Sequence, residues 1–463
     1  MYLNRGDFNL RRTRRNNMNR VALYIVLIMA GLYVLNLDRQ GKIDKPFLPT
    51  ATATRSPASY SEEAQAQFSA GRLKEAIDAY QHAIELDPTR VDYWIQLARI
   101  QVYANHPEDG LKTASRAILL APENSMAHAV HALALDWAAS QAAKDEDKST
   151  GYSDAGDAAV RAIQLDPNNA LAHAYYAEVL VDLQRYAQAR DEAKQALQLD
   201  PNSMDAYRVY GYYLESTANY EEAIQAYQSA IKINPNLPFL FMQAGVNFRI
   251  LQQYDTAIEY FRRAGSINSD DINPLLQISK TYFQTGEYGR SSQYLEAALA
   301  IDAANADVHG RLGLVYFKAL NFESAMIELT CAVDGCTTDK DTVDDKPGAP
   351  VLTIEPLPLK DRSSLEIYYT YSSALAALST PAHPYCNRAR PLFQEILAFA
   401  GDDPVVAGIV QENENICVIA EGTATAAALG GGAALTPSGT GTPAPGTETG
   451  TPAPRKPGLT TTP

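Results

Sequence analysis

Residues 204–235 read MDAYRVYGYYLESTANYEEAIQAYQSAIKINP, and this stretch decides the fold. Ala223 and Ala230 are small residues seven positions apart, which places them on one face of a helix, with Tyr227 between them. Pro235 ends this helix, because proline cannot continue one. Gly211 marks a preceding helix at a point where the two helices must approach closely. The stretch therefore predicts a pair of packed helices.

The same pair recurs along the chain at a fixed step. The residues equivalent to Ala230 are Ala83, Ala117, Ala162, Ala196, Ala264, Ala298 and Ala332. With Ala230 included, their successive separations are 34, 45, 34, 34, 34, 34 and 34 residues. The residues equivalent to Ala223 are Ala76, Gly110, Ala155, Ala189, Ala257, Ser291 and Ala325. Two columns in one register indicate eight copies of one unit, with a single insertion of 11 residues.

The first helix of each unit carries a small-residue column of its own. Its members are Ala98, Ala132, Ala177, Gly211, Gly245, Ser279 and Gly313. Large residues accompany this column, as in Trp94 with Leu97, and Leu312 with Tyr316. The pattern resembles the tetratricopeptide repeat (TPR), whose period is 34, over roughly residues 57–339. The resemblance implies an all-α fold, a right-handed superhelical solenoid of TPR helix pairs.

We expect the repeats to be flanked by less regular segments. Eight TPR units should occupy residues 57–339, with the insertion at 142–153 forming an exposed loop. An acidic, proline-containing loop at 340–362 should precede a divergent ninth helix pair and a capping helix at 363–420. The Pro/Thr/Ala-rich residues 38–56 read as a linker. The Thr/Pro/Gly/Ala-rich tail, residues 421–463, should be disordered.

The N-terminus has the pattern of a membrane-inserted segment. An apolar run without charges spans residues 21–37. It is preceded by Arg5, Arg11, Arg12, Arg14, Arg15 and Arg20. We predict a single-pass, uncleaved signal anchor, with residues 1–20 as a basic cytoplasmic tail and the repeat domain extracytoplasmic. A cleaved signal peptide is the alternative.

Composition and motifs argue against several kinds of chemistry. A formal net charge of −15 would repel phosphate backbones, so we expect no nucleic-acid partner. The chain contains no nucleophile elbow, phosphate loop or zinc-protease motif, which predicts a protein that is not an enzyme and needs no cofactor. His128, His173 and His309 occupy the column of Trp94, so we assign them to packing between helices rather than to a metal.

Four cysteines lie in the last third of the chain. An even number in a segment placed outside the cytoplasm suggests disulfides. Antiparallel packing of the last helices could bring Cys386 to Cys417, and Cys331 with Cys336 would then close a helix end. A zinc site and free buried thiols are the alternatives.

The resemblance also implies a binding surface, because the first helices of TPR units line a concave groove that binds peptide segments or folded proteins. The helix register places these residues toward that groove: Arg99, Tyr103, Leu133, Trp137, Glu178, Arg208, Tyr212, Met242, Arg249, Lys280 and Phe283. Aromatic side chains interleaved with cations suit protein segments that carry apolar anchors and carboxylates. We predict a non-catalytic protein-interaction scaffold at the outer face of the membrane, in cell-envelope assembly or secretion. The alternative is a structural or carbohydrate-binding envelope protein with a glycosylated, stalk-like tail.

Overall fold

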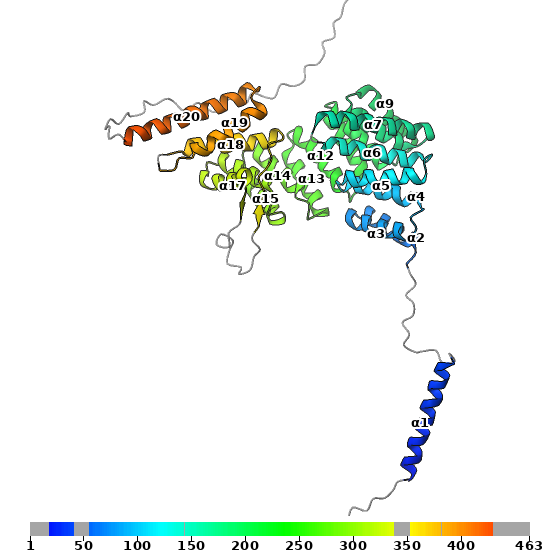
Figure 1. The fold of residues 1–463 in the computed structure, drawn as a ribbon. Helices are drawn as coiled ribbons and strands as arrows, with labels where there is room; N and C mark the ends of the chain where they lie inside the picture. The colour runs from blue at the N-terminus through cyan, green and yellow to red at the C-terminus, as the bar shows by residue number, and fades with distance from the viewer. Residues whose placement is uncertain (1–17, 41–54, 143, 338–351, 381, 429–463) are drawn as a thin grey trace, which may run out of the picture.

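Helices follow one another along almost all of the chain in the computed structural model (Figure 1). The structure describes residues 18–40, 55–142, 144–337, 352–380 and 382–428. The first helices are α1 (Met18–Arg39), α2 (Pro57–Ser69), α3 (Leu73–Leu86), α4 (Val91–Tyr103), α5 (Pro107–Leu120), α6 (Ser125–Gln141), α7 (Asp145–Leu165), α8 (Ala170–Asp182), α9 (Tyr186–Leu199) and α10 (Met204–Ser216). The later helices are α11 (Tyr220–Ile233), α12 (Pro238–Ile250), α13 (Tyr254–Ile267), α14 (Asn273–Gln284), α15 (Tyr288–Ile301), α16 (Ala306–Lys318), α17 (Phe322–Asp334), α18 (Arg362–Leu378), α19 (Cys386–Ala400) and α20 (Pro404–Ala428).

Helices α2 to α17 form eight consecutive helix pairs, and α18 with α19 forms a ninth. Helix α20 packs on both α18 and α19 at the C-terminal end of the array (Figure 1). One two-stranded antiparallel sheet, β1 (Cys336–Thr337) with β2 (Thr353–Ile354), lies between α17 and α18. The predicted all-α solenoid of TPR helix pairs is confirmed.

The repeated small residues allow the two helices of a pair to approach closely. Ala223 and Ala230 have no exposed surface, and the ring of Tyr227 between them is equally buried. A Cβ atom added at Gly211 would lie 2.8 Å from Cε1 of that ring, so only glycine fits opposite it without a shift. In the seventh unit, Ser279 and Ser291 meet instead, with their Oγ atoms 2.8 Å apart.

The turns inside the pairs repeat an unusual backbone conformation. Residues at the same position of seven turns have positive φ, between 58° and 79°. They are Gly71, Asn105, Gln184, Ala218, Gln252, Gly286 and Leu320. Proline shapes turns between pairs. For example, α11 ends at Ile233, and Asn234 is extended because the following Pro235 disfavours a helical conformation there.

The insertion in the third unit is helical, and the expectation of a loop at 142–153 was wrong. Helices α6 and α7 have 17 and 21 residues, whereas α4 and α5 have 13 and 14. The differences, four and seven, account for all 11 inserted residues. The extended helices pack tightly, because a Cβ atom on Gly151 would lie 2.6 Å from that of Ala139. Lysine and glutamate are good helix formers, so their charge did not require a loop.

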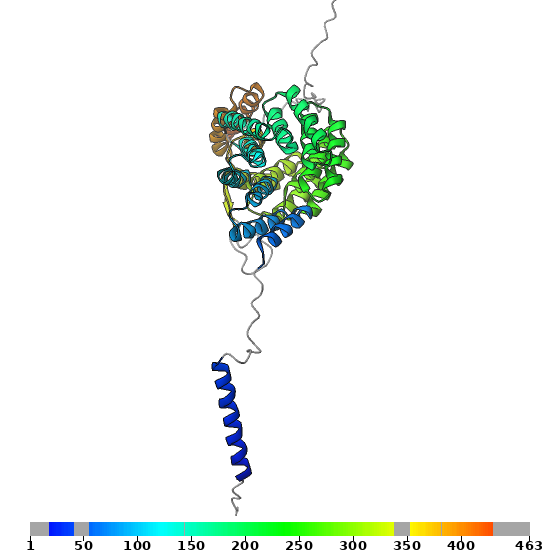
Figure 2. The same ribbon diagram turned by 90° about the vertical axis from the view of Figure 1, so that its right-hand side faces the viewer.

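The first repeat touches the sixth, which closes the first part of the solenoid into a turn (Figure 2). Asn236 Nδ2, just before α12, donates to the carbonyl oxygen of Ser69 at 2.9 Å. Gly71 sits against the Asn236 carbonyl oxygen, which a Cβ atom would approach to 1.9 Å. In Figure 2 the first repeats surround a common axis, with the blue α2 and α3 beside green helices. We call these first six repeats, joined by this contact, the closed turn.

The ends of the chain fit their predictions only in part. Residues 18–37 in α1 have a mean hydropathy of 2.0 and are long enough to cross a membrane, a test that a signal sequence also passes. Helix α20 continues to Ala428, so residues 421–428 are helical and not part of a disordered tail. Strand β2 lies within the range predicted as the acidic loop, residues 340–362. Most residues predicted as basic tail (1–20), linker (38–56) and tail (421–463) lie outside the described residues.

Candidate partner-binding groove

Four aromatic rings lie together inside the closed turn, near the contact between its first and sixth repeats. Tyr103 on α4 stacks against Phe68 of the first repeat, with ring centroids 6.4 Å apart. The same ring contacts Phe239 on α12, with centroids 5.0 Å apart, and Trp137 on α6 at 6.1 Å. Tyr103 is only 5% exposed. Aromatic side chains from four repeats thus occupy the axis itself.

Arg208 on α10 forms a two-armed ion pair with Glu178 on α8. Its Nη1 and Nη2 donate to the two carboxylate oxygens at 2.6 and 2.5 Å. Arg208 is 1% exposed and Glu178 is 4% exposed. Trp137 Nε1 donates to the same carboxylate at 3.1 Å. Burial alone would lower the pKa of Arg208, but the adjacent Glu178 charge and its hydrogen bonds outweigh burial and raise that pKa.

A second buried ion pair lies beside the first. Arg99 Nη2 on α4 donates to Asp205 Oδ2 on α10 at 2.5 Å, and Tyr103 donates its hydroxyl to the other oxygen. The guanidinium of Arg99 also lies over the rings of Phe68 and Tyr103. Helices α4 and α10, three repeats apart, are therefore joined across the axis.

Two further carboxyl groups complete the cluster. Tyr212 on α10 donates its hydroxyl to Asp182 Oδ1 on α8 at 2.5 Å. Asp136 on α6 is 2% exposed and also lies next to Asp182. Burial raises the pKa of Asp182 to about 6, and burial together with the neighbouring Asp182 charge raises that of Asp136 well above its usual value.

The N-terminal half of the expected groove is therefore occupied by its own side chains. Arg99, Tyr103, Trp137, Arg208 and Tyr212 come together as their helix register predicts, but they bond to one another and to carboxylates of the same turn. We correct their assignment from an open binding surface to an internal network. Three carboxylates of this network, Asp136, Asp182 and Asp205, were not predicted from the sequence. The helix register could have indicated them, because they are charged residues on the face of the first helices that points to the axis.

The C-terminal half of the groove differs, because two of its cations form no ion pair among the described residues. Arg249 on α12 bonds to Gln277 Oε1 at 2.6 Å and forms no ion pair with any described residue. Lys280 on α14 is exposed and likewise has no ion pair within the described ranges. Although the side chain is exposed, partial desolvation, followed by the nearby charges of Arg249 and Arg311, lowers the pKa of Lys280 against the opposing effect of the Glu366 carboxylate on α18. Arg311 on α16 pairs with Asp307 at 2.7 Å. We call Arg249, Lys280 and Arg311 the basic wall.

Apolar side chains accompany the basic wall. Phe283 lies one turn beyond Lys280 on α14 and is half-buried, with an edge contact to Tyr288 at 5.5 Å between centroids. Met242 on α12 is also half-buried, whereas Leu133, in the closed turn, is fully buried. A ligand on this part of the groove would therefore meet cations and apolar surface together.

The histidines have structural roles. Nε2 of His128, His173 and His309 lies 2.8 to 3.2 Å from the carbonyl oxygen six residues earlier. Trp94 makes the same contact with Pro88 at 3.0 Å. Nδ1 of His173 and of His309 also lies 2.6 Å from Glu192 and Glu328 on the second helix of the same pair, so these two histidines join helices as predicted.

Both predicted cysteine pairs form disulfides. Cys331 and Cys336 join the end of α17 to β1, and Cys386 and Cys417 join α19 to α20. The second pair is buried between the last helices, as antiparallel packing predicts. The pairing leaves no free thiol among the described cysteines.

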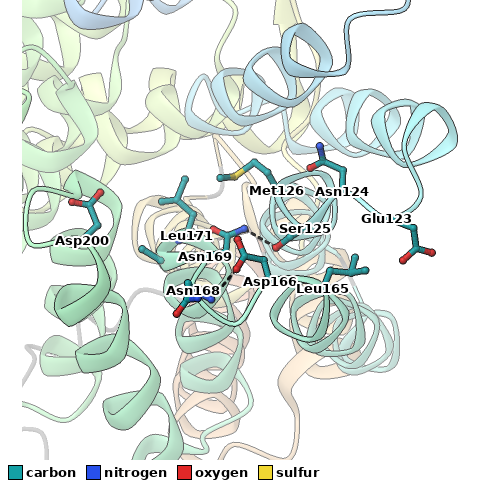
Figure 3. A pocket seen from close by; sticks show the side chains of 11 residues that line it. Glu123, Asn124, Ser125, Met126, Leu165, Asp166, Asn168, Asn169, Leu171 and Asp200 are labelled. Carbon is teal, nitrogen blue, oxygen red and sulfur yellow. Dashed lines mark hydrogen bonds between the residues drawn. The ribbon is translucent and has the colours of Figure 1, made fainter.

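A polar pocket of about 620 Å³ lies at the turns of the third to fifth repeats (Figure 3). Asn169 Nδ2 donates to Ser125 Oγ at 2.8 Å, and Asp166 Oδ1 accepts the backbone N–H of Asn168 at 3.0 Å. Asp200 accepts from Asn202 in the same way. These polar groups hold the turns and helix ends together, so we assign the pocket no ligand.

Comparison with known proteins identifies the repeat. Family models described as tetratricopeptide repeat match residues 67–134, 140–203, 177–238 and 272–305. A solved thermophilic TPR protein of Thermus thermophilus, TTC0263, is 19% identical, with a TM-score of 0.37, and the match covers 42% of this chain and 99% of that one. YrrB, titled a TPR protein with an unusual peptide-binding site, is 24% identical with a TM-score of 0.32, covering 39% and 92%. Pseudomonas aeruginosa pilF is 21% identical with a TM-score of 0.35, covering 42% and 89%. No curated protein sequence matches the chain.

Proposed function

Because this chain is a tetratricopeptide-repeat protein, we propose that it is a non-catalytic scaffold that binds acidic segments of other proteins along the basic wall. The observation that carries the proposal is the pair Arg249 and Lys280. By the helix register, these two cations line the groove on successive first helices. Arg249 is buried and Lys280 is exposed, and neither forms an ion pair among the described residues, in a chain whose net charge is −15.

The chemistry of the wall favours carboxylates over other ligands. Arg249 donates to Gln277, whose neutral amide does not compensate the guanidinium charge. Arg311, on the other side of Lys280, is held in place by its ion pair with Asp307. Lys280 between them has a lowered pKa because partial desolvation and the two like charges outweigh the attraction of the nearby Glu366 carboxylate on α18. A carboxylate at this point would relieve that repulsion, and Phe283 would contact a neighbouring apolar side chain.

Binding of a fluorescent peptide tests the proposal. The full-length protein in detergent would be titrated with a peptide of alternating Glu and Leu and with its Gln counterpart. We expect Lys280→Glu to weaken binding of the Glu peptide at least tenfold, about 1.4 kcal/mol, and to leave the weak binding of the Gln peptide unchanged. Lys74→Glu, on the exposed face of α3, is the matched control and should change neither. Equal affinity of both variants for the Glu peptide would refute the basic wall as the binding surface.

We also propose where the scaffold works: anchored by α1, with the repeats outside the cytoplasm, in cell-envelope assembly or secretion. Two features support this placement. Helix α1 is apolar enough to cross a bilayer, and the two disulfides are typical of an oxidising compartment. A carbonate wash should leave the protein in the membrane pellet. Protease added to intact spheroplasts should then digest the repeats; protected repeats would contradict the orientation.

A further inference from the structure

In the fourth repeat, His173 on α8 meets a hydrogen-bond acceptor at each of its two ring nitrogens. Its Nδ1 lies 2.6 Å from Oε2 of Glu192 on α9, the second helix of the same pair. Its Nε2 lies 3.0 Å from the carbonyl oxygen of Pro167, in the turn that precedes α8. One side chain thus connects a helix to its partner helix and to the turn before it.

The eighth repeat contains the same arrangement. His309 Nδ1 on α16 lies 2.6 Å from Glu328 Oε2 on α17, and its Nε2 lies 3.2 Å from the Ala303 carbonyl oxygen. Both sites are largely shielded from water, because the side chains of His173 and His309 are 9% and 13% exposed. The geometry is therefore a repeated feature of the array.

The number of protons on the ring decides whether both contacts can form. A carbonyl oxygen and an ionised carboxylate oxygen can only accept a hydrogen bond, and a neutral imidazole has one N–H to donate. A neutral ring therefore satisfies one contact, and at the other contact two lone pairs face each other. An imidazolium has two N–H groups and donates to both acceptors. The arrangement fits the protonated ring.

Equivalent positions in other repeats lack the second acceptor. Trp94 donates its single N–H to the Pro88 carbonyl oxygen at 3.0 Å. His128 lies 2.8 Å from the equivalent carbonyl oxygen, and its repeat has Ala158 at the position of Glu192. The carboxylate on the second helix therefore distinguishes His173 and His309 from the rest of their column.

We propose that His173 and His309 are proton-dependent joints: each protonated ring fixes its helix to the second helix of the pair and to the preceding turn, and loss of the proton loosens that repeat. Deprotonation leaves one ring nitrogen facing an acceptor with no hydrogen between them, so one of the two contacts is lost. This response to pH is a property of the repeats themselves and does not depend on binding at the basic wall.

The charges around each ring favour its protonated form. Glu192 and Asp166, at the end of α7, act on His173, and Glu328 acts on His309. Charged groups on the remaining neighbouring helices lie in other contacts: His131 on α6 near Asp154, Asp136 on α6 next to Asp182, Asp205 and Arg208 on α10 with Arg99 and Glu178, Glu296 on α15 with Tyr316, Asp307 with Arg311 on α16, and Glu366 on α18 near Lys280 of α14.

The sign of the pH dependence agrees with this geometry. The hydrogen bond to Glu192 raises the pKa of His173 against the effect of burial. Burial alone would lower the pKa of His309, but Glu328 and the Ala303 carbonyl oxygen outweigh burial and raise that pKa. The contribution of such a group to stability is fully present below the unfolded pKa, about 6.5 for histidine, and is lost as pH rises through the folded pKa. Both joints should be tight near pH 6 and loosen at alkaline pH.

Deuterium exchange of the imidazole C2 protons, followed by mass spectrometry, measures the proton affinity of each histidine in the full-length protein in detergent. His173 and His309 should hold their protons more tightly than an exposed histidine does. Glu192→Gln should weaken the proton affinity of His173 at least about tenfold, because a glutamine amide can donate to a neutral ring. Glu328→Gln should do the same to His309. Asp191→Asn removes the same charge from an exposed position of α9 and is the matched control, which should leave His173 nearly unchanged.

Amide hydrogen exchange tests whether the proton tightens the repeat. The parent and Glu192→Gln would be compared at equal pH, about one pH unit above and below the midpoint found for His173. Above it, α8 and α9 should exchange faster in the parent, because the variant keeps both contacts with a neutral ring. Below it, the parent should be the slower of the two. Helices α4 and α5, whose repeat carries Trp94, should not differ.

Each joint is judged by its own histidine. If a glutamine variant does not fold, the proton affinity of that histidine in the parent decides alone. An affinity no higher than that of an exposed histidine would overturn the proposal. So would an affinity that the glutamine variant leaves unchanged, or the same order of exchange rates on both sides of the midpoint.

Discussion

Arg208 and Glu178, on first helices of adjacent repeats, face each other at the axis of the closed turn with both guanidinium arms bonded to both carboxylate oxygens. Neither side chain reaches solvent to a significant extent. Such a pair contributes little net free energy compared with apolar side chains of the same size, yet losing one member leaves a buried charge without a partner.

Removing only one of these two charges should therefore be costly. We expect Arg208→Ala to lower the free energy of unfolding by about 3–5 kcal/mol. The combined change Arg208→Met with Glu178→Leu should cost less than either single change, because no lone charge remains. Thermal melting followed by circular dichroism measures both. Arg190→Ala, at an exposed position on α9, is the control and should change stability by at most about 0.5 kcal/mol.

Gly211→Leu should destabilise the fifth repeat through overpacking. The first added atom would lie 2.8 Å from the ring of Tyr227, which is itself fully buried. We expect a loss of roughly 1–3 kcal/mol. The double variant Gly211→Leu with Tyr227→Ala should melt higher than Tyr227→Ala alone, because the removed ring leaves room for the leucine. A double variant that is no more stable than Tyr227→Ala would show that the contact is not the cause.

Leu320→Gly should stabilise the eighth repeat. Leu320 has a φ of 61° and is 74% exposed, so its side chain contributes strain and little packing. Glycine adopts this conformation without a steric penalty, as Gly71 and Gly286 do at equivalent positions. We expect a gain of about 1 kcal/mol in the free energy of unfolding. The melting temperature should rise; a fall would mean that the flexibility of glycine in the unfolded chain outweighs the relief of strain.

Reducing the disulfides should destabilise the C-terminal end selectively. The Cys386–Cys417 bond spans 31 residues and the Cys331–Cys336 bond spans five. The chain-entropy model assigns about 3–4 kcal/mol to the longer loop and about 2 kcal/mol to the shorter. Hydrogen exchange with and without reductant should accelerate in α19 and α20 and remain unchanged in α4 to α10. Uniform acceleration along the array would contradict a local effect.

The sequence predicts the repeat and its contacts well, because close helix packing admits few residues at fixed positions. Gly211 and Ser279 show this at the first-helix column, and Ala223 at the second. The closed turn could not be predicted in this way. Asn236 and Ser69 are 167 residues apart, and their contact depends on small rotations summed over five repeats. For the same reason, the sequence could not indicate that residues such as Arg208 bond to one another inside a closed ring of repeats.

The bond between Asn236 and Ser69 changes how the molecule responds to force. An array whose repeats touch only their neighbours stretches like a spring, because each interface yields in turn. Here a pull on α2 reaches α12 by two routes, through the intervening repeats and directly through the turn at Gly71. The first six repeats therefore share a load as a hoop does, while α14 to α20 lie beyond this contact. Tension applied at the N-terminal end should extend the C-terminal repeats before it opens the hoop.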